Sequence, residues 1–237
     1  MWDTLTRPWQ VCLEEAWDAY CSGSVPIGAT ITDSKGEVLS RGRNRIHEIQ
    51  EAGIALHGHS LAHAEINALI SLDHSRIDRS TCVLYTTTEP CPLCMGAFYM
   101  YSLRNLCYAS RDPYAGSTNL LGKTPYLSRK PIQVIGPQRD DLEWTIMALY
   151  VEYALRYGGE RYQVVFDEWE RAVPQSIFFG RQFYQSGLLA WMVRWMGWFP
   201  SMRMDHLYGK QLSGWTGGQW TNAIPYQSGV ALKESFR

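Results

Sequence analysis

An α/β fold is predicted for the first two thirds of this 237-residue chain, because segments with helical spacing alternate with segments of strand composition. Apolar side chains recur at near-helical intervals over residues 9–21, and an apolar, β-branched stretch follows at 25–32. The run at 81–88 is β-branched and aromatic, which is typical of a buried strand. Hydrophobic residues make up 46% of the chain, which is enough for a substantial core and does not indicate disorder.

Most of the expected elements have a recognisable start or stop. Ser22 and Gly23 end the first helix, and a tight turn at 33–36 joins the strand at 25–32 to a hairpin partner at 37–43. The remaining elements are a helix at 61–72, the strand at 81–88, a helix that begins at residue 91, short strands at 106–109 and 131–135, and a helix at 140–157. Pro92 suits the start of the helix at 91, because a proline at the first helical position loses no hydrogen bond.

Residues 158–237 differ in character from the domain predicted for 1–157 and are expected to form a C-terminal extension, mainly helical and irregular. This part holds six of the ten tryptophans, and Trp191, Trp195 and Trp198 would share one helix face. We expect it to pack on the core or on a partner subunit and to help close the pocket, since an exposed apolar patch of this size is rare. An interfacial membrane helix is the alternative. Arginines interrupt the apolar run, which falls short of the about 20 residues that cross a bilayer.

Charge and cysteine content limit the partners and the compartment. The formal net charge of −1 shows no electrostatic footprint for nucleic acid, so a nucleic-acid partner and a membrane partner are not expected. The six cysteines stand in a chain that begins without a secretory apolar segment, and we therefore expect a reducing, cytoplasmic environment without disulfides.

Two short motifs carry the chemistry. His63-Ala64-Glu65 opens the helix at 61–72, and Pro90-Cys91-Pro92-Leu93-Cys94 opens the helix at 91. His63, Cys91 and Cys94 provide three zinc ligands, which predicts one zinc per chain with a fourth position for water. Cys91 and Cys94 lie three residues apart at the positive end of a helix dipole, which favours the thiolate that binds zinc.

Each motif alone has a plainer interpretation, and the pair together is specific. A histidine two residues before a glutamate is common on solvated helix faces, and a lone C-x-x-C can be a redox pair, half of a structural zinc site or two buried thiols. Here both occur in one order, about 25 residues apart, with a proline before the first cysteine. The carboxylate of Glu65 adds an acid–base group that a purely structural site does not need.

These residues resemble the cytidine/deoxycytidylate deaminase zinc-binding family of the cytidine deaminase-like superfamily, in the branch of guanine, fungal-type cytosine and tRNA adenosine deaminases. The resemblance covers about residues 9–157 and includes the segments 25–29, 42–45, 63–69 and 88–97. It implies a three-layer α/β/α fold with a mixed five-stranded sheet, zinc between the two motif helices, and usually a homodimer. It also implies that Asn44 hydrogen-bonds the substrate base, although a turn residue that satisfies its own backbone is the alternative for Asn44.

The function expected from these residues is hydrolytic deamination of a small free nucleobase or nucleoside, with ammonia as product. Zinc would lower the pKa of a bound water so that hydroxide attacks the amino-bearing ring carbon, with Glu65 as proton shuttle. Backbone N–H groups near Ala64 and Cys91, at two helix N-termini, could hold polar substrate atoms, and Asp112 in the Gly- and Pro-rich loop 110–130 could contact the base edge. An RNA adenosine deaminase is the alternative enzyme, and a non-catalytic zinc-stabilised module is the other class.

Overall fold

The computed structural model describes residues 2–49, 55–73, 75 and 77–196. Its centre is a five-stranded sheet in the order β2-β1-β3-β4-β5. The strands are β1 (Gly28–Thr32), β2 (Val38–Arg43), β3 (Val83–Thr88), β4 (Asn105–Ser110) and β5 (Gln133–Ile135). β1 pairs antiparallel with β2 and β3, whereas β3 with β4 and β4 with β5 are parallel. The predicted α/β class and the mixed five-stranded sheet are therefore confirmed.

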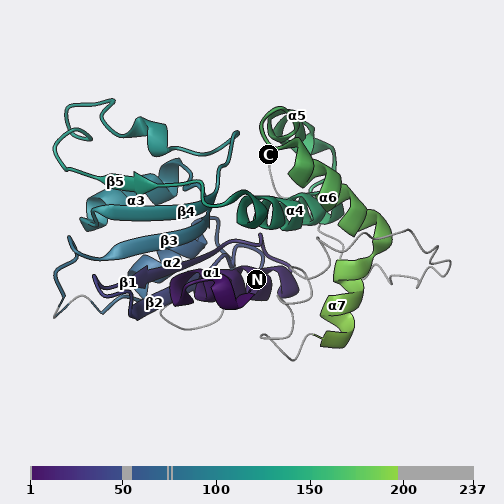
Figure 1. The fold of residues 1–237 in the computed structure, drawn as a ribbon, viewed down its shortest axis with the longest axis horizontal. Coiled ribbons are helices and arrows are strands. Elements are labelled where there is room, and N and C mark those ends of the chain that lie inside the picture. Colours follow the sequence, from purple (N-terminus) through teal and green to yellow (C-terminus); the bar gives the residue numbers. More distant parts are fainter. Residues whose placement is uncertain (1, 50–54, 74, 76, 197–237) are drawn as a thin grey trace.

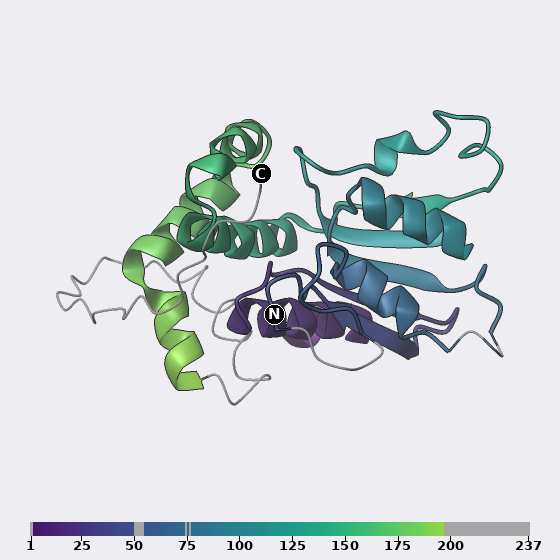
Figure 2. The same ribbon diagram turned by 180° about the vertical axis from the view of Figure 1, so that it is seen from behind.

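Helices cover both faces of the sheet and make three layers. α1 (Arg7–Cys21) and α4 (Asp140–Tyr157) lie on one face (Figure 1), and α2 (Ala64–Ile70) and α3 (Pro92–Tyr101) lie on the other (Figure 2). The second face is held by a buried apolar cluster in which Ala68 and Leu69 of α2 and Phe98 of α3 meet Ile31 and Leu84 of the strands. Alternate residues of a strand point to opposite faces, so each central strand supplies both layers.

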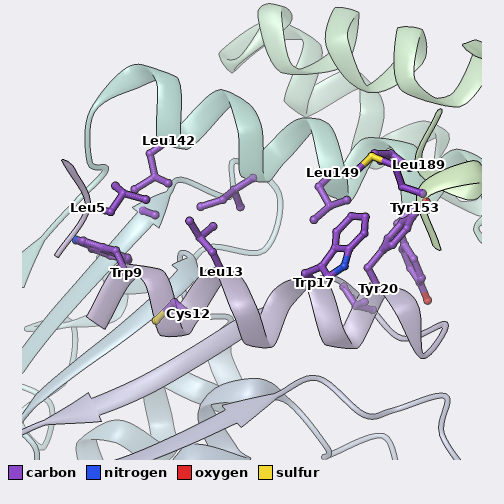
Figure 3. Packing of buried hydrophobic residues seen from close by; sticks show 14 of the residues in the cluster. Leu5, Trp9, Cys12, Leu13, Trp17, Tyr20, Leu142, Leu149, Tyr153 and Leu189 are labelled. Atoms are coloured by element: carbon purple, nitrogen blue, oxygen red, sulfur yellow. The ribbon is translucent and has the colours of Figure 1, made fainter. Parts of the chain in front are cut away.

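The larger core cluster lies between α1 and α4 (Figure 3). Trp9, Leu13 and Trp17 are spaced four apart on α1 and point toward Leu142 and Leu149 of α4. Full burial of side chains of this size contributes roughly 1.5–3 kcal/mol each, which favours the packing of α1 on α4.

A buried ionic group also joins these two helices. Glu152 of α4 is fully buried, accepts a hydrogen bond from the Tyr20 hydroxyl at 2.5 Å, and forms an ion pair with Arg156 one turn further along. A buried carboxylate without partners is strongly unfavourable, so these bonds favour one register of α1 on α4.

Three further helices follow α4 and lie beyond it, away from the sheet (Figure 1): α5 (Gln163–Ala172), α6 (Pro174–Ser186) and α7 (Leu188–Met196). Phe166, Trp169 and Ile177 of α5 and α6 form a buried cluster with Met147 and Val151 of α4. Short 3-10 turns complete the described chain at Trp2–Thr4, Thr118–Leu120 and Gly159–Tyr162. The division at residues 157 and 158 stays a prediction.

The tryptophan face predicted for the extension falls partly outside the described residues. α7 contacts the core through Leu189 and Met192, which are buried, whereas Trp191 is 52% exposed. Trp198 and the Trp195 side chain lie outside the described part of the chain. Among the described helices, none combines the length and the apolar character that a bilayer crossing requires.

Two predicted boundaries differ from the structure, and each has a local cause. Apolar composition predicts the first strand from residue 25, but Ile27 donates its backbone N–H to the Val25 carbonyl at 2.7 Å in a tight turn, and β1 begins at Gly28. The helix expected at 61–72 spans only Ala64–Ile70, because His63 has extended backbone angles (φ −74°, ψ 156°) and occupies the N-cap position. The remaining predicted strands and helices of residues 1–157 are present within one to three residues of the expected bounds, apart from the end of the helix at 91, for which the sequence gives no prediction.

Candidate zinc and substrate site

The site lies where the first turns of α2 and α3 meet. His63 is the N-cap residue of α2, Cys91 is the N-cap residue of α3, and Cys94 lies in the first turn of α3. Both caps have extended backbone angles, which is why the ligand side chains lie at the helix ends rather than along a helix face. Pro92 at the start of α3 gives up an N–H that has no partner in a helix anyway.

α2 reaches this position because Gly42 of β2 has no side chain. A Cβ atom at Gly42 would lie 2.9 Å from the carbonyl carbon of Asn67, and closer still to backbone atoms of Ala64 and Ala68. Two hydrogen bonds hold the helix there: Ser40 Oγ donates to the Ala68 carbonyl at 2.9 Å, and Asn67 Nδ2 donates to the Arg43 carbonyl at 3.1 Å. The close approach of β2 and α2 therefore sets where His63 and Glu65 lie.

The three predicted ligands form one group whose geometry fits zinc. His63 Nδ1 lies 3.6 Å from Cys91 Sγ and 3.5 Å from Cys94 Sγ, and all three atoms lie within 4.8 Å of one another. Zn–S bonds of about 2.3 Å and Zn–N bonds of about 2.0–2.1 Å in a tetrahedron give an N···S separation of about 3.6 Å. The donor set and its spacing therefore match a zinc ion with three protein ligands, and zinc is the cofactor of this domain.

The protonation states of the two thiols and the imidazole in this group depend on one another. The Cys94 S–H and the neighbouring His63 ring lower the pKa of Cys91 to about 4, against the opposing effect of burial. The same contact raises the pKa of Cys94, because a second thiolate would repel the first and is buried as well. Because the pKa of Cys91 is lowered, one thiolate forms in this group even without a cation. A bound cation would favour the second thiolate as well.

Glu65 is buried directly beside the ligands. Its side chain is 3% exposed, Oε1 accepts a hydrogen bond from Thr86 Oγ1 at 3.0 Å, and Oε2 accepts one from Cys94 Sγ at 3.2 Å. Burial raises the pKa of the Glu65 carboxyl, because the charged form is poorly solvated there. A carboxyl group with a raised pKa, fixed next to a metal-ligand group, is suited to taking up and returning a proton.

The predicted substrate contacts Asn44, Ala64 and Asp112 form no described hydrogen bond with the ligands. Asn44 follows β2 and is 2% exposed, and its Oδ1 accepts a hydrogen bond from the Ile46 backbone N–H at 3.2 Å. This bond is the one expected if Asn44 is a turn residue that satisfies its own backbone. The contact of Asn44 with the substrate base stays a prediction. Ala64 is fully buried as the first residue of α2.

Asp112 lies in the loop after β4 and already has partners for one carboxylate oxygen. Oδ1 accepts backbone hydrogen bonds from Tyr114 at 3.0 Å and Ala115 at 3.1 Å, and a third from the indole N–H of Trp169 at 3.2 Å. The hydrogen bonds of the described residues leave its Oδ2 without a partner. The contact of Asp112 with the base edge stays a prediction, and Oδ2 is the oxygen that would make it.

Several residues of this site are absent from the prediction. Thr86 orients Glu65 from the middle of β3, and Glu89 accepts hydrogen bonds from the backbone N–H groups of Asp112 (3.4 Å) and Thr118 (3.2 Å). Trp169 reaches Asp112 from the extension. The sequence around Thr86 does not indicate a role in the site, because threonine is common in β-branched strands. The position of Glu89, two residues before Cys91, does indicate such a role.

The comparisons with known proteins agree with this geometry. The family described as cytidine and deoxycytidylate deaminase zinc-binding region matches residues 4–110. Cytosine deaminase of Candida albicans is 33% identical over 115 residues, which cover 47% of this chain and 70% of that protein. A probable cytosine deaminase of Schizosaccharomyces pombe is 29% identical over 130 residues, covering 50% and 75%.

The chain is also similar to a tRNA-specific deaminase and to a solved structure. A tRNA-specific adenosine deaminase of Bacillus subtilis is 33% identical over 113 residues, covering 46% of this chain and 63% of that protein. A crystal structure in complex with 2,6-diaminopurine superposes with a TM-score of 0.50 at 24% identity, covering 64% of this chain and 82% of that chain, and it supports the fold. The matched segment contains all three ligands and Glu65, and the chain belongs to the cytidine and deoxycytidylate deaminase zinc-binding family.

Proposed function

We propose that this chain catalyses hydrolytic deamination of a small free nucleobase or nucleoside and releases ammonia. The observation that carries the proposal is the carboxylate of Glu65, which is buried and hydrogen-bonded beside the three ligand atoms. A non-catalytic zinc module has no use for a carboxyl group in that place. The cytosine deaminases among the relatives support a free base as substrate.

In the reaction, a C–O bond replaces the C–N bond of the amino group, and water supplies the oxygen and the protons. Zinc held by His63, Cys91 and Cys94 would lower the pKa of a coordinated water. Glu65 would take up a proton at the oxygen that is close to Cys94, pass it to a ring nitrogen, and later protonate the leaving amine. Thr86 would keep the other oxygen of Glu65 fixed through both transfers.

Around the reacting carbon, this chain would orient the base through backbone and side-chain groups. The backbone N–H of Ala64, at the start of α2, would hold an electron-rich substrate atom. Asn44 would contact the base from the end of β2. A homodimer and a cytoplasmic location, both expected from the sequence, stay predictions that size-exclusion chromatography with light scattering and cell fractionation can test.

An RNA adenosine deaminase is the second candidate, and one feature of the structure favours it. A groove of about 550 Å³ is lined by Ser80, Arg104, Asn105, Arg129, Pro131, Ile132 and Gln133. The described residues form no salt bridge with Arg104 or Arg129, and burial together with their charges lowers the pKa of nearby Lys130. Unpaired cations suit phosphate oxygens. The groove lies at the amino ends of β4 and β5, however, opposite the end of β3 that leads to Cys91.

The test is a panel assay with purified zinc-loaded protein. Ammonia release is measured with cytosine, guanine, adenine and their nucleosides, and with a tRNA anticodon stem-loop, in each case beside Glu65→Ala. Turnover of a free base or nucleoside that disappears in Glu65→Ala supports the proposal. Turnover of the stem-loop alone, reduced by Arg104→Gln with Arg129→Gln, would establish the RNA enzyme instead. No turnover of any substrate would refute both.

A further inference from the structure

Trp169 connects the extension to the loop beside the zinc ligands. It lies in α5, is 1% exposed, and donates its indole N–H to Asp112 Oδ1 at 3.2 Å across 57 positions of sequence. Asp112 is 9% exposed, so this bond is made in a buried setting where a lost partner is costly. The indole nitrogen is donor only, and the bond therefore requires an acceptor oxygen that faces the extension.

The loop that carries Asp112 is tied to the residues just before Cys91. Glu89 accepts hydrogen bonds from the backbone N–H groups of Asp112 and Thr118, and Ser117 donates its N–H to the Pro90 carbonyl at 3.0 Å. A Cβ atom at Gly116 would collide with the Glu89 carboxylate, so the loop passes as close to Glu89 as the backbone allows. The position of Asp112 is thus defined on one side by the zinc-ligand segment and on the other by Trp169.

Tyr150 of α4 completes this arrangement. Its ring contacts the Trp169 ring, with centroids 4.8 Å apart and an interplanar angle of 58°. Burial raises the pKa of the Tyr150 hydroxyl, and the charges of Tyr162 and Asp112 raise it further. Tyr150 nevertheless keeps some exposed surface.

We propose that Trp169 is a positioning residue for substrate recognition: together with the backbone N–H groups of Tyr114 and Ala115 it holds Oδ1 of Asp112, so that Oδ2 is free to accept a hydrogen bond from the N–H edge of the bound base. This inference rests on the proposed function and makes it more specific. A fixed carboxylate oxygen selects bases that present a ring N–H or an amino group away from the reacting carbon, and Tyr150 would form part of the same wall. A base without such a donor would leave a buried carboxylate oxygen unpaired.

Trp169 also fills space next to Phe166 and Met147, so a test has to separate its N–H group from its bulk. Trp169→Phe removes the donor and retains an aromatic ring. Trp191→Phe is the matched control, because it makes the same change in the same extension at a side chain that is 52% exposed. Asp112→Ala removes the acceptor, and the double variant shows whether the two residues act together.

The experiment measures kcat and KM for the base that the panel assay identifies, together with zinc content and unfolding temperature. Trp169→Phe is expected to raise KM about 3- to 10-fold, as expected for one hydrogen bond, with kcat within about twofold. Combined with Asp112→Ala, it should add little to the effect of Asp112→Ala alone, and Trp191→Phe should change neither constant.

Two outcomes would overturn the inference while the proposed function stands. One is a Trp169→Phe variant with unchanged KM on a base that the parent deaminates. The other is additivity of the two substitutions in their effects on KM. An unchanged KM together with a loss of unfolding temperature and zinc would make Trp169 a core residue only. A parent protein that deaminates no base or nucleoside would refute the proposed function, and the inference with it.

Discussion

Replacing Gly42 by alanine should damage the site without changing a ligand or Glu65. The new Cβ would lie 2.9 Å from the Asn67 carbonyl carbon, whereas ordinary contact begins at 3.4 Å, so α2 has to move by at least about 0.5 Å (3.4 − 2.9) and by more at its two closer atoms. The hydrogen bonds from Ser40 and Asn67 oppose this movement. Overpacking of this kind costs about 1–3 kcal/mol, and a misplacement of about 1 Å can cost ~10²-fold in rate.

The assay compares urea unfolding and kcat/KM for Gly42→Ala with the same measurements for Gly96→Ala. Gly96 is an exposed residue of α3 that lies two residues from Cys94, and the Cβ that alanine adds there would meet no atom within 4 Å. Alanine there should stabilise the helix by up to about 1 kcal/mol and leave activity intact. We expect Gly42→Ala to lose about 1–3 kcal/mol and ~10- to 100-fold in kcat/KM. If Gly42→Ala matches Gly96→Ala in both measurements, the close approach of β2 to α2 does not position Glu65.

Four other substitutions and one control test the site and the core. Cys91→Ser and Cys94→Ser should each lose zinc in metal analysis, because each removes one of three ligands, and full retention by both would contradict the assignment. Glu65→Ala should keep its zinc and its unfolding temperature but lose about 10²- to 10⁴-fold or more in kcat, so activity within a factor of ten of the parent would assign the proton transfers elsewhere. Glu152→Gln should lose about 3 kcal/mol in urea unfolding, since it leaves Arg156 without its buried partner. Glu168→Gln, in an exposed pair, should lose less than about 1 kcal/mol, and equal losses would show that burial of Glu152 is unimportant.

The elements that sequence predicts well are those defined by local chemistry. α4 has the predicted bounds, Asp140–Tyr157, because its apolar residues keep helical spacing between an acidic start and a glycine. The ligands are also predictable, since a ligand set is a property of residue type and spacing and His63, Cys91 and Cys94 lie at helix starts with local signals. The predicted start of β1 is wrong because the turn at Val25 depends on one backbone hydrogen bond that apolar composition does not reveal.

Contacts between distant segments are beyond sequence reasoning. Asp112 is predicted as a residue that touches the base, and nothing near it in the chain indicates that Trp169 would occupy one of its oxygens. Thr86 and Tyr150 are similar cases, because a strand threonine and a helix tyrosine are ordinary core residues until the fold places Glu65 or Trp169 beside them. Loop conformation and helix docking decide these contacts, and both depend on the whole domain.

The residues proposed for chemistry and those proposed for selectivity come from different parts of this chain. The ligands and Glu65 come from two helix starts that the central sheet holds together, whereas Asp112, Tyr150 and Trp169 come from a loop, from α4 and from the extension. Substitutions in the second group should therefore alter which base binds, as a change in KM, while Glu65 continues to move protons at an unchanged kcat. In the proposed arrangement Trp169 acts through Asp112 and not through a ligand, so a substitution in the extension would change the selectivity of this chain without disturbing its zinc site.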